Sequence, residues 1–361
     1  MHEIAYKNLI DYLGFKEEIG ILDPLQRLAL ASENVLKTLD VDTRYIYPNP
    51  PSFWKYKEEN DGTWIDEFGI KFKKVGYYSD VVEPPLKGKT FDEIKQYRFP
   101  DPFDKNRFDG LKEKSKYLYE NTEFALVSGA VFDVYCPYWK LRGLEEALID
   151  VSINRSIANY ILDKIMDWTI SFGSALLDEI GDFIEYWWIA DDWGTQQGPL
   201  IRPEVFREIF KPRLAKVISY LKSRTNAKCC YHSCGSIYWC IQDLIDVGID
   251  IIHPLQPNAY GNDDTARIKK EFGDKISFHG GTNNQGLFHS NLIDVQIDTL
   301  ARNRDLAPGG GYIFSSGHNI QPNCPPQNII GLIDIAKRFG NYPIDIQLIN
   351  EEISKLIDKK F

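Results

Sequence analysis

The stretch Ala227-Lys228-Cys229-Cys230-Tyr231-His232-Ser233-Cys234-Gly235 combines a short apolar run with polar, turn-forming residues that follow at once. An apolar run of this length, bounded by turn residues, predicts a buried strand. Residues at i and i+2 of a strand project to the same side, so His232 and Cys234 present an imidazole and a thiol together. Zinc favours this pair of ligands, and His318 and Cys324 offer further ligands later in the chain. An alternative is a buried imidazole beside a small apolar thiol.

The same pattern recurs through the rest of the chain. Apolar runs occupy 124–130, 183–190, 227–232, 249–255, 276–279 and 312–315. Amphipathic stretches of helical length separate most of them, for example 157–172 and 205–221, and Gly248, Gly273 and Gly340 are expected as left-handed helix ends. Alternating strands and helices predict an α/β fold with a parallel sheet. A (β/α)8 barrel needs eight strands, so two more would have to lie in irregular stretches.

The first 110 residues have a different rhythm, in which short helix-like pieces alternate with Pro, Gly and Asp. Residues 24–39 have helical spacing, and 61–79 alternate in a way that predicts a small hairpin. We therefore expect residues 1–110 to form an N-terminal covering extension packed on the barrel, and residues 111–361 to form the barrel itself.

The composition argues against some classes of binding partner and indicates the cellular compartment. The net charge is −10, and no Lys/Arg-rich run is present, which argues against a nucleic-acid surface. No apolar run approaches the roughly 18 residues of a membrane-spanning helix, and the start of the chain shows no secretory pattern. We expect a cytoplasmic protein whose six cysteines remain reduced.

Polar clusters follow five of the apolar runs. They occupy 191–196, 232–235, 253–258, 279–284 and 315–321. The carboxyl ends of the strands of a parallel barrel share one face, and that face holds the active site. Turn chemistry explains the Gly, Asn and Asp residues, but it does not readily explain why four of the six histidines lie at strand ends. These clusters therefore predict one shared catalytic face.

Several residues in the clusters have two interpretations. Asp191 and Asp192 are either caps of the next segment or an acid, a base or an outer anchor of the site. Trp193 is either a core residue or a pocket wall. His253 and His279 are expected to hydrogen-bond loop backbones rather than to bind metal.

The motifs together resemble the uroporphyrinogen decarboxylase superfamily, and within it the corrinoid-linked methyltransferase branch. The resemblance rests on Asp192-Trp193-Gly194-Thr195-Gln196, His232-Ser233-Cys234-Gly235-Ser236, Ile252-His253-Pro254-Leu255-Gln256, Phe278-His279-Gly280-Gly281-Thr282 and His318-Asn319-Ile320-Gln321 with Pro325-Pro326 and Asn328. Asp66-Glu67-Phe68-Gly69 looks like a segment of that branch with Phe in place of Trp. The likeness extends from about residue 30 to 340 and implies a distorted (β/α)8 TIM barrel, which fits the two strands not seen in the sequence.

The resemblance also implies a metal and its ligands. Thiol methyltransferases of the superfamily hold zinc with a His-x-Cys pair and a later Cys. His232 and Cys234 match the pair, whereas His318 stands at the later position, and Cys324 is the alternative third ligand. Decarboxylases of the superfamily carry an Arg-rich N-terminal segment that grips substrate carboxylates, and no such segment is visible here.

The function implied is O-demethylation, in which a methyl group passes from a methoxylated aromatic compound to the cob(I)alamin of a separate corrinoid protein. The alternatives are a zinc-dependent methylcobalamin:thiol methyltransferase, a uroporphyrinogen-type decarboxylase and a silent binding protein for aromatic ligands. We expect catalytic roles for Asp192, His232 and His318, and a homodimer. The residues expected to bind substrate are Tyr135, Trp193, Gln196, Gln256 and Asn319.

Overall fold

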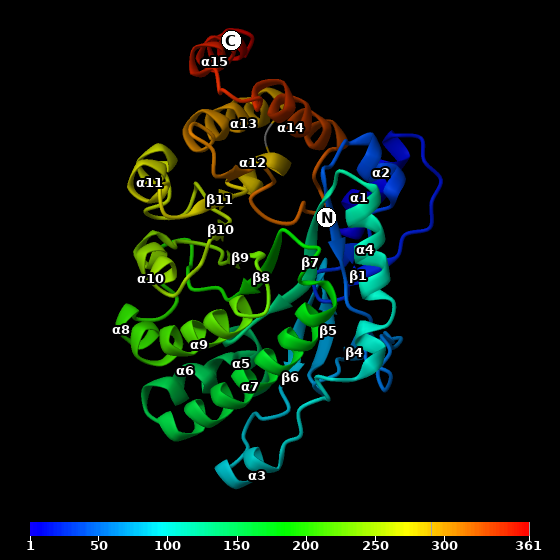
Figure 1. Cartoon of the computed structure of the whole chain (residues 1–361), viewed down its shortest axis with the longest axis vertical. Coiled ribbons are helices and arrows are strands. Elements are labelled where there is room, and N and C mark those ends of the chain that lie inside the picture. Colours follow the sequence, from blue (N-terminus) through cyan, green and yellow to red (C-terminus); the bar gives the residue numbers. More distant parts are fainter. Residues whose placement is uncertain (290, 361) are drawn as a thin grey trace.

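A parallel sheet of seven strands forms the centre of the molecule in the computed structural model, which describes residues 1–289 and 291–360 (Figure 1). In spatial order the strands are β3 (Thr43–Ile46), β7 (Ala125–Phe132), β8 (Tyr186–Ala190), β9 (Lys228–His232), β10 (Ile251–His253), β11 (Ser277–His279) and β12 (Tyr312–Ile313). Every neighbouring pair is parallel. The sheet curls into a half-barrel, so the predicted α/β fold, a distorted (β/α)8 TIM barrel, is confirmed.

The strands agree closely with the sequence. Each of the six predicted apolar runs overlaps one strand, and β3 is a seventh that the sequence did not reveal. No eighth strand joins this sheet within 1–289 and 291–360.

Helices follow most of the barrel strands and lie outside the sheet (Figure 1). After β7 come α5 (Tyr135–Arg142), α6 (Leu144–Ser152) and α7 (Arg155–Ile180); after β8 come α8 (Pro203–Val205), η2 (Phe206–Phe210) and α9 (Lys211–Lys222); after β9 come η3 (Tyr238–Cys240) and α10 (Ile241–Asp246). The remaining elements of this part are α11 (Thr265–Phe272), α12 (Asn284–His289), α13 (Leu292–Leu306), α14 (Pro326–Phe339) and α15 (Ile346–Asp358). The two helices predicted over 157–172 and 205–221 are therefore confirmed. The second contains one turn of π-helix, η2.

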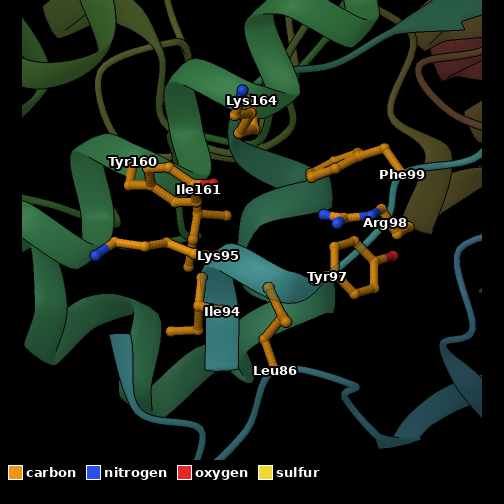
Figure 2. A pocket seen from close by; sticks show the side chains of 9 residues that line it. All are labelled: Leu86, Ile94, Lys95, Tyr97, Arg98, Phe99, Tyr160, Ile161 and Lys164. Atoms are coloured by element: carbon orange, nitrogen blue, oxygen red, sulfur yellow. The ribbon is translucent and has the colours of Figure 1, made fainter. Parts of the chain in front are cut away.

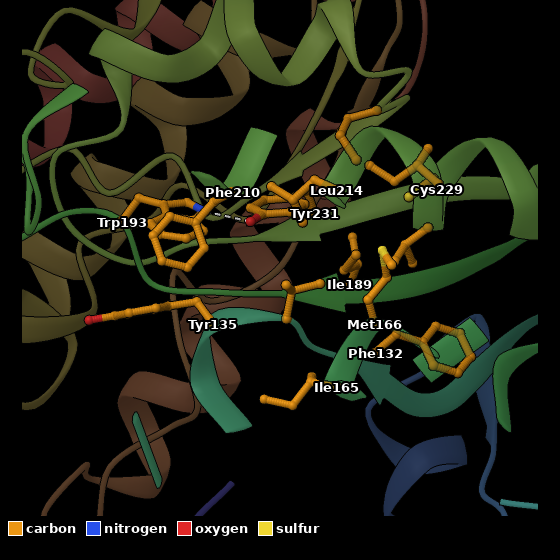
Figure 3. Packing of buried hydrophobic residues seen from close by; sticks show 14 of the residues in the cluster. Phe132, Tyr135, Ile165, Met166, Ile189, Trp193, Phe210, Leu214, Cys229 and Tyr231 are labelled. Carbon is orange, nitrogen blue, oxygen red and sulfur yellow. Dashed lines mark hydrogen bonds between the residues drawn. The ribbon is translucent and has the colours of Figure 1, made fainter. Parts of the chain in front are cut away.

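Both faces of the sheet are apolar, which explains why its strands are continuous apolar runs rather than alternating ones. Trp188 and Cys230 belong to a small cluster inside the barrel. Trp187, Cys229 and Tyr231 belong to the large core that fills the space between the strands and the outer helices. Figure 3 shows part of this outer core, in which Tyr231 lies beside Leu214 of α9.

The N-terminal part contains a separate antiparallel sheet formed by β4 (Thr63–Ile65), β5 (Lys71–Val75) and β6 (Tyr78–Glu83). The hairpin predicted over 61–79 is thus confirmed. The helix suggested by the spacing of 24–39 is wrong over most of its length, because this segment contains the short strand β2 (Leu28–Ala29) and only α2 (Glu33–Thr38) is helical. In the first part of this segment, β2 instead pairs with β1 (Ile21–Asp23), which comes just before it in the chain.

The other N-terminal elements are α1 (Glu3–Tyr12), α3 (Phe91–Gln96), η1 (Lys105–Phe108) and α4 (Leu111–Asn121). Strand β3 also lies within the first 110 residues, although it pairs with β7 in the central sheet. Residues 1–110 therefore contribute a strand to the central sheet, which the expected division of the chain did not include.

Only one of the three predicted left-handed helix ends is present. Gly248 has φ of 95°, as expected. Gly273 and Gly340 keep right-handed values of −62° and −97°. At Gly273 the backbone N–H still donates to the carbonyl of Lys269, so the helical hydrogen bonding continues and no left-handed residue is needed.

None of the helices in the described ranges combines the length and the apolar composition that crossing a lipid bilayer would require.

Candidate metal centre

Three side chains with metal-binding atoms converge at the carboxyl end of the barrel. His232 ends β9, Cys234 follows it by two residues, and His318 lies in the segment between β12 and α14. One ligand atom from each lies within 4.8 Å of the others. The Cys234 Sγ and His232 Nε2 atoms are 3.4 Å apart. Zinc bonds of about 2.0–2.3 Å in a tetrahedron keep ligand atoms roughly 3.3–3.8 Å apart, so this donor set fits zinc after small movements.

The alternative third ligand is not part of this group. Cys324 is buried in a different cluster, where it packs with Tyr6 and Leu9 of α1 and with Ile329 of α14. Of the two alternatives, His318 lies in the group of possible ligands and Cys324 does not.

Two backbone features hold Cys234 beside His232. The Cys234 N–H donates to Asp192 Oδ1 at 2.8 Å. Gly235 has φ of 77°, a value that suits glycine, and a Cβ atom there would lie 2.6 Å from the backbone of Gly194. The loops that follow β8 and β9 therefore pass each other in direct backbone contact.

Asp192 lies next to the three possible metal ligands. Its Oδ1 is 3.7 Å from His232 Nε2, and its side chain is 50% exposed. Its contact with the Cys234 N–H is that of an outer anchor of the site.

Asp191 has the capping role that the sequence left open. It is fully buried, and its Oδ1 accepts the N–H groups of Tyr135 at 2.7 Å and Cys136 at 2.8 Å. Both donors lie at the first turn of α5, where a carboxylate satisfies free N–H groups. Asp191 thus fixes α5 to the end of β8.

A second acidic residue, Asp133, was missed by the sequence reasoning. It follows β7 directly, in the same relation that Asp191 has to β8. The pKa of Asp133 is raised to about 7, chiefly by burial; the charge of Lys140 opposes this rise and the charge of Asp192 adds to it. Asp133 Oδ1 is buried without a hydrogen-bond partner among the described residues. A carboxyl group of this kind can hold a proton near neutral pH.

The histidines at the strand ends are uncharged at neutral pH. Burial lowers the pKa of His232 to about 4 and the pKa of His279 to about 3. Burial also lowers the pKa values of His253 and His318. Neutral imidazole is the form that binds a metal ion.

Among the described residues, the side chains of His253 and His279 make none of the hydrogen bonds to loop backbone that we predicted. His253 Nδ1 lies 2.8 Å from His232 Nδ1. His279 Nδ1 is buried and without a hydrogen-bond partner in the described structure. Neither belongs to the group of possible metal ligands among the described residues.

Two residues predicted to bind substrate lie instead in the core. Trp193 and Tyr135 are buried, and their rings stack with centroids 5.0 Å apart. The Trp193 indole N–H donates to the hydroxyl of Tyr231 (Figure 3). These rings support the loop after β8 from the side of the outer helices, and their contact with a substrate stays a prediction.

The other three predicted substrate residues connect loops. Gln256 accepts the Gly235 N–H at 3.0 Å and donates to Gln196 Oε1 at 3.0 Å. Asn319 donates to Gln26 Oε1 at 2.8 Å, which links the segment after β12 to the N-terminal part. Gln196 is exposed, whereas Gln256 and Asn319 are half-buried. All three lie in segments that follow barrel strands.

A pocket of 230 Å³ lies elsewhere, beside α3 and α7 (Figure 2). Its lining consists of Leu86, Ile94, Lys95, Tyr97, Arg98, Phe99, Tyr160, Ile161 and Lys164. None of these residues belongs to the polar strand ends, so this pocket is distinct from the candidate metal centre.

Known proteins resemble this chain in sequence and in structure. A family model described as uroporphyrinogen decarboxylase (URO-D) matches residues 65–339. A uroporphyrinogen decarboxylase of Coxiella burnetii is 20% identical over 186 residues, which cover 50% of this chain and 47% of the relative. One of Geobacter metallireducens is 20% identical over 348 residues, covering 93% of this chain and 92% of the relative. The chain thus spans about half the length of the first relative and nearly all of the second.

Among solved structures, a methyltransferase from Methanosarcina mazei has a TM-score of 0.56 and 17% sequence identity, covering 76% of this chain and 77% of that protein. This similarity shows a shared fold. The family model covers well over half of the chain, and on that ground the chain belongs to the uroporphyrinogen decarboxylase family.

Proposed function

We propose that this protein is a zinc-dependent methyltransferase. It would move a methyl group from a methoxylated aromatic compound to the cob(I)alamin of a separate corrinoid protein. The observation that carries this proposal is the convergence of His232, Cys234 and His318 at the carboxyl end of the barrel. The resemblance to the corrinoid-linked branch gives the reaction class and the partner.

The chemical difficulty lies in the leaving group. When the methyl–oxygen bond breaks and the methyl–cobalt bond forms, the aromatic oxygen keeps the bonding electrons as a phenolate, which is a poor leaving group unless it is stabilised. Zinc, when bound, would supply Lewis acidity at this oxygen. His232, Cys234 and His318 would hold the metal, and Asp192 would keep Cys234 in place through its backbone N–H.

A proton donor could complete the departure of the phenol. Sequence reasoning offered Asp192 as one possible acid, whereas Asp133 has the burial and the raised pKa that a donor near neutral pH needs. We therefore propose Asp133 as the donor and Asp192 as the anchor of the cysteine loop. The nucleophile comes from the partner, so no Ser/His/Asp group is needed in this chain.

The aromatic nature of the substrate rests on the resemblance alone. Trp193 and Tyr135, the two aromatic residues that we had placed against the substrate, are buried and lend it no independent support. A thiol acceptor therefore remains the second candidate, because a site with a cysteine ligand is also suited to holding zinc for thiol methylation.

Decarboxylation of a porphyrinogen is a weaker candidate. The buried arginines of the first 150 residues already have acidic partners: Arg44 pairs with Glu33, and Arg107 pairs with Glu67. Arg142 likewise binds Asp150. These guanidinium groups stabilise the fold and are not available to grip substrate carboxylates.

The test begins with metal analysis of the purified protein and of the His232→Ala, Cys234→Ala and Cys324→Ala variants. We expect about one zinc per chain in the wild type and in Cys324→Ala, and little in the other two. The zinc-loaded protein is then incubated with methoxybenzoates and free cob(I)alamin, and loss of the Co(I) absorbance is followed. Equal metal content and activity in all four proteins would exclude zinc catalysis. Methylation of thiols by methylcobalamin, without demethylation of any aryl ether, would favour the second candidate.

A further inference from the structure

Three histidines form a row across the interior of the barrel. His232, His253 and His279 are the last residues of β9, β10 and β11. The strand register pairs His253 directly with His232, and the pairing of β10 with β11 brings His279 next to His253. The ring centroids are 5.0 Å apart in the first pair and 4.7 Å apart in the second. A row of imidazoles thus begins at the candidate metal ligand and runs into the barrel.

The first contact in the row defines where protons lie. The Nδ1 atoms of His232 and His253 are 2.8 Å apart. A neutral imidazole has one N–H and one lone pair, so one proton lies between these two nitrogens. His232 directs its other nitrogen, Nε2, toward Cys234 Sγ at 3.4 Å. If Nε2 binds a metal, the proton of His232 must be on Nδ1, and His253 must accept it.

We infer that His253 is a positioning residue for the metal centre: its Nδ1 atom accepts a hydrogen bond from His232 and thereby presents His232 Nε2 to the metal. This inference rests on the proposed zinc site. Metal-binding histidines usually donate their second N–H to a carboxylate, a backbone carbonyl or water. A neutral imidazole accepts the same hydrogen bond without adding negative charge, so His232 remains a weaker electron donor and the metal a stronger Lewis acid.

The surroundings of His253 keep its ring in this orientation. Its backbone carbonyl accepts the N–H of Ser233 at 2.8 Å, which ties it to the cysteine loop. The ring of Trp188 meets it edge-on with centroids 5.1 Å apart. At Gly280 a Cβ atom would lie 3.3 Å from His253 Cδ2, so the backbone also closes around the ring.

The experiment compares His253→Phe, which keeps a ring but removes the acceptor, with His253→Gln, whose amide oxygen can accept. The control is His279→Phe. His279 is buried in the same row, but its Nδ1 has no hydrogen-bond partner in the described structure, so this variant tests altered packing without loss of that contact. Zinc dissociation constants are measured by competition with a chromogenic chelator. The imidazole protons are observed in 15N-histidine-labelled protein by NMR.

We expect His253→Phe to bind zinc roughly 10–100-fold more weakly than the wild type. His253→Gln should recover most of this loss of zinc affinity. His279→Phe should bind zinc with a dissociation constant within about threefold of the wild-type value, which is small compared with the effect of losing a hydrogen-bond partner of a metal ligand. The wild-type spectrum should contain a proton coupled to nitrogens of two different imidazoles, and His253→Phe should lack it.

Two results would overturn the inference while the zinc site stands: equal zinc affinity in the wild type and His253→Phe, or equal weakening in His253→Phe and His279→Phe. A wild-type protein that binds no zinc would instead overturn the metal site itself, and the inference with it.

Discussion

Replacing Asp133 with Asn should stabilise the protein, and the gain should grow as the pH rises. Burial raises the pKa of Asp133 from 3.8 to about 7. Each pKa unit corresponds to about 1.4 kcal/mol. Above pH 7, ionisation of Asp133 in the unfolded chain would therefore lower the free energy of unfolding by up to about 4 kcal/mol. Because Asp133 keeps some contact with solvent, screening reduces this value, and we expect about 2 kcal/mol.

The pH range follows from the two pKa values. Below pH 4 Asp133 is protonated in both the folded and the unfolded chain, so its charge has no effect on stability. Between pH 4 and 7 only the unfolded chain releases the proton, and the wild type loses stability progressively relative to Asp133→Asn. Above pH 7 the difference becomes constant.

Urea unfolding at pH 5 and pH 8 measures this difference. Asp80→Asn serves as the control, because Asp80 is exposed in β6, and it should change the free energy of unfolding by less than about 0.5 kcal/mol at both pH values. The reasoning fails if Asp133→Asn is less stable than the wild type at pH 8, or if its advantage is the same at both pH values. The same variant should lose methyl transfer if Asp133 donates the proton.

Three further outcomes can be measured directly. Gly235→Ala should lower the free energy of unfolding by about 3 kcal/mol, because it combines a positive φ with a Cβ atom 2.6 Å from the backbone of Gly194. Its control is Gly76→Ala, where φ is 63° but nothing lies within 4 Å of the added Cβ atom. This control should lower the free energy of unfolding by only about 1 kcal/mol in the same urea experiment. Trp193→Phe should lower the free energy of unfolding by about 2 kcal/mol, because it removes the indole donor to the buried Tyr231 hydroxyl and leaves a small cavity. Zinc at 100 times its dissociation constant should stabilise the wild type by about 2.7 kcal/mol and leave the Cys234→Ala variant unchanged, as differential scanning calorimetry with and without a chelator would show.

The strands could be predicted because burial on both faces requires apolar residues at nearly every position. Strand β8, with Trp187, Trp188 and Ile189, meets this requirement throughout. Strand β3 could not be predicted in the same way, because Thr43 and Arg44 interrupt its pattern. Arg44 is buried with its guanidinium paired to Glu33 of α2, and that contact depends on the tertiary fold.

The spacing of 24–39 failed for a related reason. Helical periodicity is a local signal, but the first half of this segment satisfies its backbone in a different way. The N–H of Leu30 donates to the carbonyl of Gly20, and the N–H of Ala29 donates to the carbonyl of Met1. Hydrogen bonds to backbone groups distant in the sequence take the place of helical hydrogen bonds in this segment. The spacing of apolar residues carries no information about such distant partners.

The candidate site shows the same division between local and distant information. His232 and Cys234 share one side of one chain segment, so their proximity follows from strand geometry alone. His253 could have been placed beside His232 as well, since both end neighbouring parallel strands, but only if the register had been known. A shift of one residue in that register would turn His253 toward the outer helices, where Tyr231 and Ile252 now pack. The His232–Cys234 pair is thus encoded within one short segment, whereas His318 and the row of imidazoles are brought in by the tertiary fold. Substitutions that disturb the pairing of β9 with β10 should therefore weaken metal binding even when every ligand is intact.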